Sequence, residues 1–334
     1  MSLGRYAPAS SAGRPASCRA RHSPGSGHPT GKVSASRHSA RRYTATTVPI
    51  AVIAFDFDPL FHLADGLTVR WQTLALAAVI ALCLITAGIL ARRDGLRTDD
   101  LLYIVIGAVP GAVIGGRIGY AVLVPAAFGA GPQSLLDPAV GGLELGLAVI
   151  GGIASGSVVA ALLGAPVGRW AHLLSVPLLV AIAAGKLTMA LGGSGQGRPF
   201  DGTWATAYLG AGPWVDTAAS LPSHPAQVYE GVATLVAVFV IVLATLIGAF
   251  RGRDGSRLLL GVATWGIIRA VVSTTWRDPS VVGVLPAGGV LAVALAIGLV
   301  LGAIAVSVWW PRRSREQAIA GAPAWPDPET RPRF

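Results

Sequence analysis

Seven long apolar segments dominate the chain between residues 72 and 310. Each holds about 20 mostly apolar residues, the length that a helix needs to cross the hydrocarbon core of a bilayer. The pattern therefore predicts an all-α polytopic membrane protein with seven transmembrane helices and a small extracytoplasmic head. The predicted spans are residues 72–91, 101–124, 141–164, 171–191, 228–250, 258–276 and 284–310.

The remaining segments differ in character. Segment 44–70 alternates apolar and polar residues and is interrupted by Asp and Pro, which predicts short strands or an interfacial element. The longest connection, 192–227, contains seven glycines and predicts a small head or lid on the outer side. Residues 1–43 and 311–334 are polar and rich in Ser, Arg or Pro, which is typical of disordered tails. A membrane domain over 44–310 is thus expected between two tails.

Composition excludes several classes of protein. Hydrophobic residues make up 53% of the 334 positions and charged residues only 13%, about half the charge of a soluble domain. The net charge of +10 comes mainly from eight Lys and Arg in 1–43, and the rest of the chain has 18 basic and 16 acidic residues. No basic aromatic stripe remains, so no nucleic-acid partner is expected. Cys18 and Cys83 suggest no disulfide, and we predict no metal or cofactor.

Arginines in the short loops predict the orientation in the membrane. The loops after the first, third and fifth spans and the segment after the seventh are basic, whereas the alternate loops hold at most one basic residue. Cytoplasmic loops carry the excess of Lys and Arg, so the N-terminus is expected outside and the C-terminus in the cytoplasm. The basic tail 1–43 opposes this orientation, and a misassigned start codon is one interpretation. The basic positions are Arg92, Arg93, Arg97, Arg169, Arg251, Arg253, Arg257, Arg312, Arg313 and Arg315.

Ionisable residues inside the predicted spans are candidates for function, because charge within a bilayer is costly. Three cations and two anions suggest a polar cavity between helices that opens to the outer side. The alternative is structural: ion pairs that hold helices together, or long side chains that reach the interface. The five residues are Arg117, Glu144, Lys186, Glu230 and Arg269.

Two motifs lie at the outer ends of spans. GGSGQGRP, which contains Gly197 and Arg198, reads as a glycine-rich loop whose N–H groups could bind an anionic phosphate beside Lys186. HPAQVYE opens the fifth span and brings His224 and Glu230 within two helical turns. A His and a Glu so close could act as a general base and its orienting partner. The alternative for this motif is a helix cap and an interfacial anchor.

The order of these motifs on seven spans resembles that of the bacterial prolipoprotein diacylglyceryl transferases. The resemblance covers roughly 50–310 and rests on GGRIGY, GLAVIGG, GK…GRP and, most specifically, HPAQVYEG. It implies a bacterial cell-membrane enzyme that moves the diacylglyceryl group of phosphatidylglycerol to a lipobox cysteine, with glycerol phosphate as the leaving group. The implied partners are phosphatidylglycerol, preprolipoprotein signal peptides and the lipid bilayer.

The resemblance also implies residue roles. Phosphate binding falls on four cations and Gly197, proton transfer on His224 and Glu230, and substrate orientation on Gln227 and Tyr229. The four cations are Arg117, Lys186, Arg198 and Arg269.

Several positions depart from the family pattern. Lys186 replaces an Arg and Ile150 replaces a His, and further replacements stand at Gln72, Met189, Ser194 and Ser273. A non-catalytic lipid- or lipoprotein-binding membrane protein is the alternative. A solute transporter is disfavoured, because no internal repeat is present.

Overall fold

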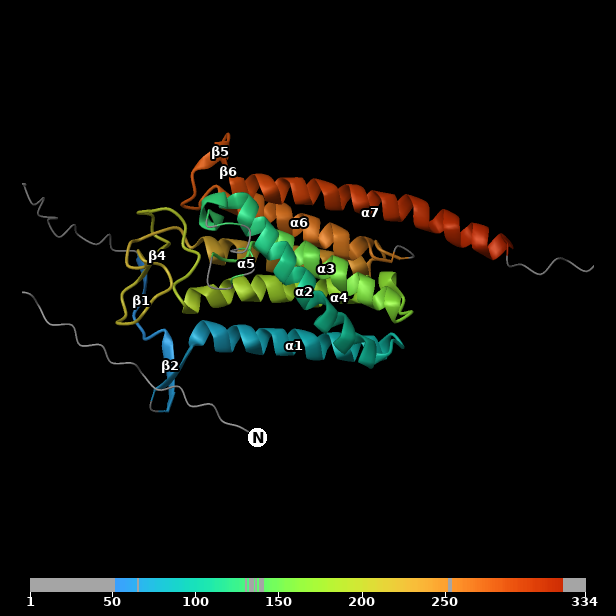
Figure 1. Cartoon of the computed structure of the whole chain (residues 1–334), viewed down its shortest axis with the longest axis horizontal. Coiled ribbons are helices and arrows are strands. Elements are labelled where there is room, and N and C mark those ends of the chain that lie inside the picture. The colour runs from blue at the N-terminus through green and yellow to red at the C-terminus, as the bar shows by residue number, and fades with distance from the viewer. Residues whose placement is uncertain are drawn as a thin grey trace, which may run out of the picture. The chain divides into compact units, whose positions relative to one another are not determined.

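The structure, a computed structural model, describes residues 52–64, 66–129, 131, 135, 137, 141–251 and 254–320. Within these residues seven helices are long and apolar enough to cross a membrane, which confirms the predicted number of spans. The helices lie side by side along the long axis, and the strands gather beyond one end of them (Figure 1). The predicted tail 1–43 lies outside the described residues. The helices are α1 (Trp71–Arg93), α2 (Thr98–Leu123), α3 (Leu145–Leu162), α4 (Val167–Thr188), α5 (Ala226–Leu246), α6 (Ser256–Ser273) and α7 (Ala287–Ala320).

Most helix boundaries differ by a few residues from those expected, and two of the differences have a clear cause. The third helix begins at Leu145 rather than at 141, because the Glu144 carboxylate caps it and accepts hydrogen bonds from the backbone N–H groups of Gly146 and Leu147, both at 2.7 Å. The last helix continues to Ala320, past the predicted end at 310. Residues 312–320 are largely Arg, Glu, Gln and Ala, which favour helix. The predicted tail 311–334 is therefore helical as far as 320, and its remainder lies outside the described residues.

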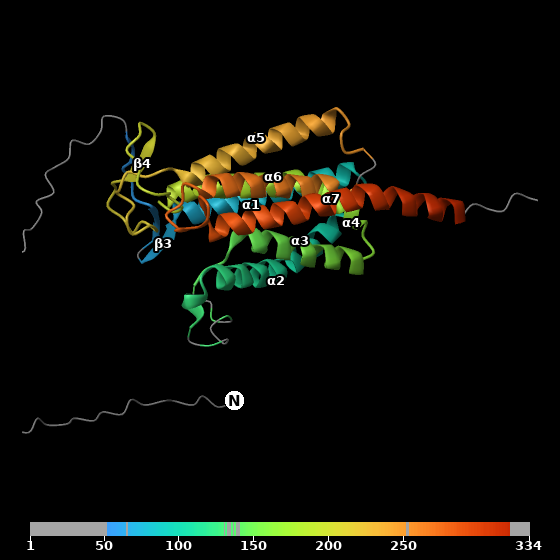
Figure 2. The same ribbon diagram turned by 90° about the horizontal axis from the view of Figure 1, so that it is seen from above.

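Helices α2 and α3 form a hairpin in which the two backbones touch (Figure 2). A Cβ atom added to Gly111 would lie 2.3 Å from the Gly151 carbonyl oxygen, and one added to Gly151 would lie 2.1 Å from that of Gly111. Small residues at helical spacing allow such an approach in a membrane. The glycine-rich sequences of these spans are thus explained by packing.

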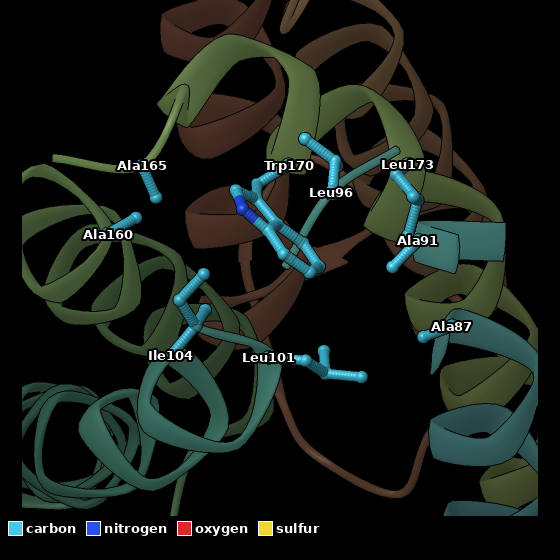
Figure 3. Close-up of a cluster of buried hydrophobic side chains, with 9 residues drawn as sticks. All are labelled: Ala87, Ala91, Leu96, Leu101, Ile104, Ala160, Ala165, Trp170 and Leu173. Carbon is cyan, nitrogen blue, oxygen red and sulfur yellow. The ribbon is translucent and has the colours of Figure 1, made fainter. Parts of the chain in front are cut away.

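Two apolar cores hold the bundle together. The first surrounds Trp170, which is 2% exposed, and joins α1, α2, α3 and α4 (Figure 3). It lies where α1 ends and α2 begins, at the end of the bundle away from the strands (Figure 1). The second joins α4, α5 and α6 through Leu179, Val262 and Trp265, among others. Because α4 belongs to both cores, it fixes the position of its own last turn, where Lys186 lies.

The head consists of short strands together with the 192–227 connection. Strands were expected in segment 44–70, of which the structure describes 52–64 and 66–70. Phe55 stacks on Tyr208 at 4.9 Å between ring centroids, and Trp214 packs against Tyr208 at the same distance. The long connection is thus fastened to the entry segment. Among the described residues, β1 (Val52–Phe55) pairs with β4 (Ala205–Tyr208) in parallel. Two further pairs are antiparallel: β2 (Leu60–Ala64) with β3 (Leu67–Arg70), and β5 (Ser280–Val282) with β6 (Leu285–Pro286).

Candidate functional site

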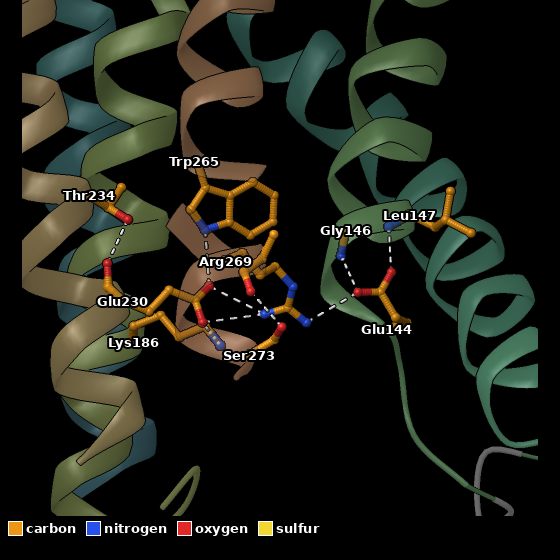
Figure 4. A network of polar contacts seen from close by, with 10 residues as sticks. Glu144, Gly146, Leu147, Lys186, Glu230, Thr234, Trp265, Arg269 and Ser273 are labelled. Atoms are coloured by element: carbon orange, nitrogen blue, oxygen red, sulfur yellow. Dashed lines mark hydrogen bonds and ion pairs between the residues drawn. The ribbon is translucent and has the colours of Figure 1, made fainter. Parts of the chain in front are cut away.

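Four of the five charged residues predicted within the membrane meet in one cluster (Figure 4). The Glu230 carboxylate lies 2.9 Å from Lys186 Nζ and 3.3 Å from Arg269 Nη1. Trp265 Nε1 donates a third hydrogen bond to Glu230 at 3.0 Å. On the other side, Arg269 Nη2 lies 3.2 Å from Glu144. Residues from α4, α5, α6 and the cap of α3 therefore converge on one point.

The cluster is buried and electrically balanced. Glu230 is 1% exposed and Arg269 is 8% exposed, so each charge has lost most of its contact with water and needs a partner. The two cations and two carboxylates supply these partners to one another. The Arg269 guanidinium also lies 4.8 Å from the ring centroid of Trp276, a cation–π contact that fixes its plane.

A cavity of about 230 Å³ adjoins the cluster. Lys186, Glu230 and Arg269 form its inner wall, and Arg277 and Asp278 lie at the solvent-exposed rim. Polar groups that converge on a concave site are typical of a ligand-binding pocket. Its other lining residues are Gly195, Gln196, Ala226, Gln227 and Trp276.

Arg277 is a residue that the sequence analysis did not assign to the site. Its Nη1 atom lies 2.8 Å from Asp216, and its Nε donates to the Gly197 carbonyl at 2.8 Å. Its Nη2 donates to Ser223 Oγ at 3.3 Å. Arg277 thus fastens the 192–227 connection to the end of α6. The Arg–Asp pair directly after the sixth span was the available signal.

His224 is close in sequence to residues that line the cavity, but its side chain contacts residues that do not line it. Its ring stacks on Phe200 at 4.0 Å, and its Nδ1 lies 3.3 Å from the Tyr229 hydroxyl. Burial, and secondarily the Arg198 charge, lower the pKa of His224, so the imidazole is neutral at pH 7. The predicted orienting partner, Glu230, is instead bound to Lys186, Arg269 and Trp265.

The glycine-rich loop does not offer the predicted free N–H groups at Gly197 and Arg198. The N–H of Gly197 donates to the His224 carbonyl at 2.7 Å, and that of Arg198 donates to the Thr275 carbonyl at 2.8 Å. A Cβ at Gly197 would lie 2.3 Å from the Thr275 oxygen, so this glycine permits a close backbone approach. The Arg198 side chain is exposed.

Arg117 lies outside the cluster, contrary to the prediction that it contributes to the same phosphate site. Its Nε donates to the Leu135 carbonyl at 2.9 Å and its Nη2 to the Asp137 carbonyl at 2.7 Å. Its guanidinium also lies over the Phe128 ring at 5.3 Å. Arg117 therefore holds the loop between α2 and α3.

Gln227 and Tyr229, the predicted orienting residues, lie on the first turn of α5 and have different partners. Gln227 is buried and donates from Nε2 to the Tyr208 hydroxyl at 3.2 Å. Burial raises the pKa of Tyr208 to about 12, so this hydroxyl stays protonated. Tyr229 accepts a hydrogen bond from Trp204 Nε1 at 2.7 Å. Only Gln227 of the two predicted residues lines the cavity.

One of the positions that depart from the family pattern lies beside the cluster. Ile150 lines a narrow crevice with Glu144 and Arg269, so an apolar side chain stands where the family pattern has a histidine. Two other replacements contact each other, because Ser194 Oγ donates to Gln72 Oε1 at 3.2 Å.

A balanced ion cluster within a bundle of seven apolar helices, next to a polar cavity, defines a multi-pass membrane protein with a buried polar site. In the part of the chain that the structure describes, no group of three His, Cys, Asp or Glu residues could hold a metal ion. A family model described as "Prolipoprotein diacylglyceryl transferase" matches residues 59–309. The chain belongs to this family.

Proteins named phosphatidylglycerol–prolipoprotein diacylglyceryl transferase resemble this chain at low identity but over most of its length. The protein of Methylocella silvestris is 26% identical over 277 residues, which are 78% of this chain and 97% of that protein. The one from Rhodospirillum rubrum is 29% identical and covers 67% of this chain and 78% of its own length. The one from Beijerinckia indica is 28% identical, with 76% and 94% covered.

Proposed function

We propose that this protein transfers the diacylglyceryl group of phosphatidylglycerol to the cysteine thiol of a prolipoprotein and releases glycerol phosphate. The names of its relatives support both substrates. The observation that carries the proposal is the presence of Lys186 and Arg269 on the wall of a single cavity. Two cations at one site suit an anionic phosphodiester.

The cations bind the phosphate and stabilise the charge that develops on it as the carbon–oxygen bond breaks. Arg269 supplies a planar guanidinium that Trp276 holds in place, and Lys186 supplies a point charge. Arg277, paired with Asp216, lies at the rim of the cavity, and Arg198 is exposed on the 192–227 connection that Arg277 contacts. Glu230 holds Lys186 and Arg269 in position when the site is empty.

His224 accepts the thiol proton in this proposal. The thiolate is the nucleophile, and a neutral imidazole can accept a proton at pH 7. The lowered pKa of His224 and its position two residues before Ala226 on the cavity wall support the role. Tyr229, at 3.3 Å from Nδ1, orients the ring.

The site faces the outer side of the membrane, where the signal peptides of prolipoproteins emerge. Arginines lie in the last turn of α1 and in or next to the first turns of α2, α4 and α6, all at the end of the bundle away from the head. This arrangement supports an N-terminus outside and a C-terminus in the cytoplasm.

The test is transfer of labelled lipid from phosphatidylglycerol to a lipobox peptide by the purified chain in detergent. We expect a thioether-linked diacylglyceryl peptide and one equivalent of glycerol phosphate. A matched peptide with Ser in place of the lipobox Cys should give no product. Binding of phosphatidylglycerol without transfer would instead favour the non-catalytic alternative, which the replacement at Ile150 suggests.

A further inference from the structure

The charge balance of the buried cluster has a consequence for substrate binding. Lys186 and Arg269 are both paired with carboxylates, Glu230 and Glu144. At the rim, Arg277 is paired with Asp216, and Asp278 adds a further carboxylate. Glu144 pairs with Arg269 but does not line the cavity; with it included, the cluster of described residues has no surplus positive charge.

An anionic phosphodiester would add a third negative charge to this balanced set. Coulomb repulsion at such short distances is strong where water is largely excluded. The phosphate can bind Lys186 and Arg269 only if one carboxylate leaves these cations. Neutrality is then restored if that carboxylate takes up a proton.

The contacts distinguish the two carboxylates. Glu144 accepts hydrogen bonds from two backbone N–H groups at 2.7 Å in the first turn of α3, and it does not line the cavity. Glu230 lines the cavity, and two of its three side-chain partners are the cations that the phosphate would contact. Its third partner, Trp265 Nε1, can donate equally to a protonated carboxyl group.

We propose that Glu230 takes up one proton from solution when the phosphate of the lipid headgroup displaces it from Lys186 and Arg269. The proposal rests on the function proposed above. During transfer the sulfur–carbon bond forms and the carbon–oxygen bond to phosphate breaks. The thiol proton goes to His224, and the Glu230 proton goes to the departing phosphate oxygen. Glu230 then returns to the two cations and displaces glycerol phosphate.

Proton uptake is measured by calorimetric titration of the full chain in detergent with dihexanoyl phosphatidylglycerol at about pH 7.5, in two buffers of different ionisation enthalpy. The lowered pKa of His224 keeps that residue neutral at this pH. We expect uptake of about one proton per lipid, and an affinity that falls about tenfold per pH unit as the pH rises. Binding of the lipid without proton uptake would overturn the proposal.

Variants assign the proton to one group. Glu230→Gln keeps the shape of the side chain without its charge, so it should bind the lipid with no proton uptake and with little dependence on pH. Asp278→Asn removes the other carboxylate of the cavity, and His224→Gln removes the nearby histidine; both should retain the uptake. Uptake that persists in Glu230→Gln, or that disappears in His224→Gln, would overturn the assignment. If Glu230→Gln does not fold, the proposal is tested by proton uptake in the wild-type protein and in the Asp278→Asn and His224→Gln variants.

The outcomes separate the two proposals. Transfer of lipid to the lipobox peptide without proton uptake would leave the proposed function intact and refute the role of Glu230. If phosphatidylglycerol neither binds nor reacts, both proposals fail together. Dihexanoyl phosphatidylethanolamine serves as the comparison lipid, and its tighter binding would also count against both proposals, because its headgroup carries no net charge.

Discussion

At the scale of single residues, Lys186 is the cation whose removal tests the phosphate site most directly. Lys186→Met should weaken binding of phosphatidylglycerol by about 10²-fold, because it removes one of the two cations of the inner wall. Lys186→Arg keeps the charge and adds bidentate geometry, so it should retain or improve transfer. The measurement is lipid binding and transfer by the two variants, compared at equal amounts of folded protein. Wild-type transfer by Lys186→Met would remove Lys186 from the site.

His224 is the second residue whose role can be tested, by rate and by pH. As a general base it must be neutral, so transfer at saturating lipid should be full above its pKa and fall as the pH drops through that pKa, which burial and the Arg198 charge lower. His224→Gln should lower the rate by about 10²-fold and abolish this acid limb.

Arg198→Gln provides the matched control for this prediction. Removing the Arg198 charge should raise the pKa of His224 and shift the acid limb to higher pH. A limb that stays in place in Arg198→Gln, or a fully active His224→Gln, would show that His224 is not the base.

A site residue can be predicted from the sequence when its type is rare in the segment that surrounds it. Charged residues stand out in apolar spans, so Glu144, Lys186, Glu230 and Arg269 were found from the sequence. Arg117 looks identical in sequence, yet its guanidinium donates to the backbone carbonyls of Leu135 and Asp137. Only tertiary structure decides which cation meets which carboxylate.

At the scale of elements, the contact between α2 and α3 carries a prediction of stability. Gly111→Ala would bring a Cβ within 2.3 Å of a backbone oxygen of α3, which cannot move aside as a side chain can. We expect a loss of about 1–3 kcal/mol in the free energy of unfolding. Gly298→Ala on α7 is the control, because no atom lies within 4 Å of the new Cβ. Equal stability of both variants, measured by thermal unfolding in detergent, would contradict the contact.

The helices themselves could be predicted because a run of apolar residues is a local signal. Their ends were less predictable, since the start of α3 depends on a side-chain cap and the end of α7 on helix-forming residues beyond the apolar run. The pairing of β1 with β4 is not a local property at all. It joins segments separated by about 150 positions, and short strands carry no signal of their distant partners.

At the scale of the whole molecule, the two ends of the bundle differ in chemistry. The strands, the cavity and the ion cluster lie toward one end, whereas Trp170 and the basic loops lie toward the other. The second core, around Val262 and Trp265, separates the two. Because the two ends differ, a lipid headgroup can bind at one end of the bundle while apolar packing holds the other end together.

The difference between the two ends predicts how the bundle is oriented in the membrane. Arginines end α1 and begin α2, α4 and α6 at the basic end, so that end should face the cytoplasm. Fusions of alkaline phosphatase, which is active only when exported, should be inactive after Asp94 and after Arg315 and active after Ser280. Fluorescent-protein fusions at the same three positions are the matched control and should give the opposite pattern. Phosphatase activity after Arg315 would place the C-terminus outside, and the cavity would then face the cytoplasm, where the proposed acceptor cysteine is not presented.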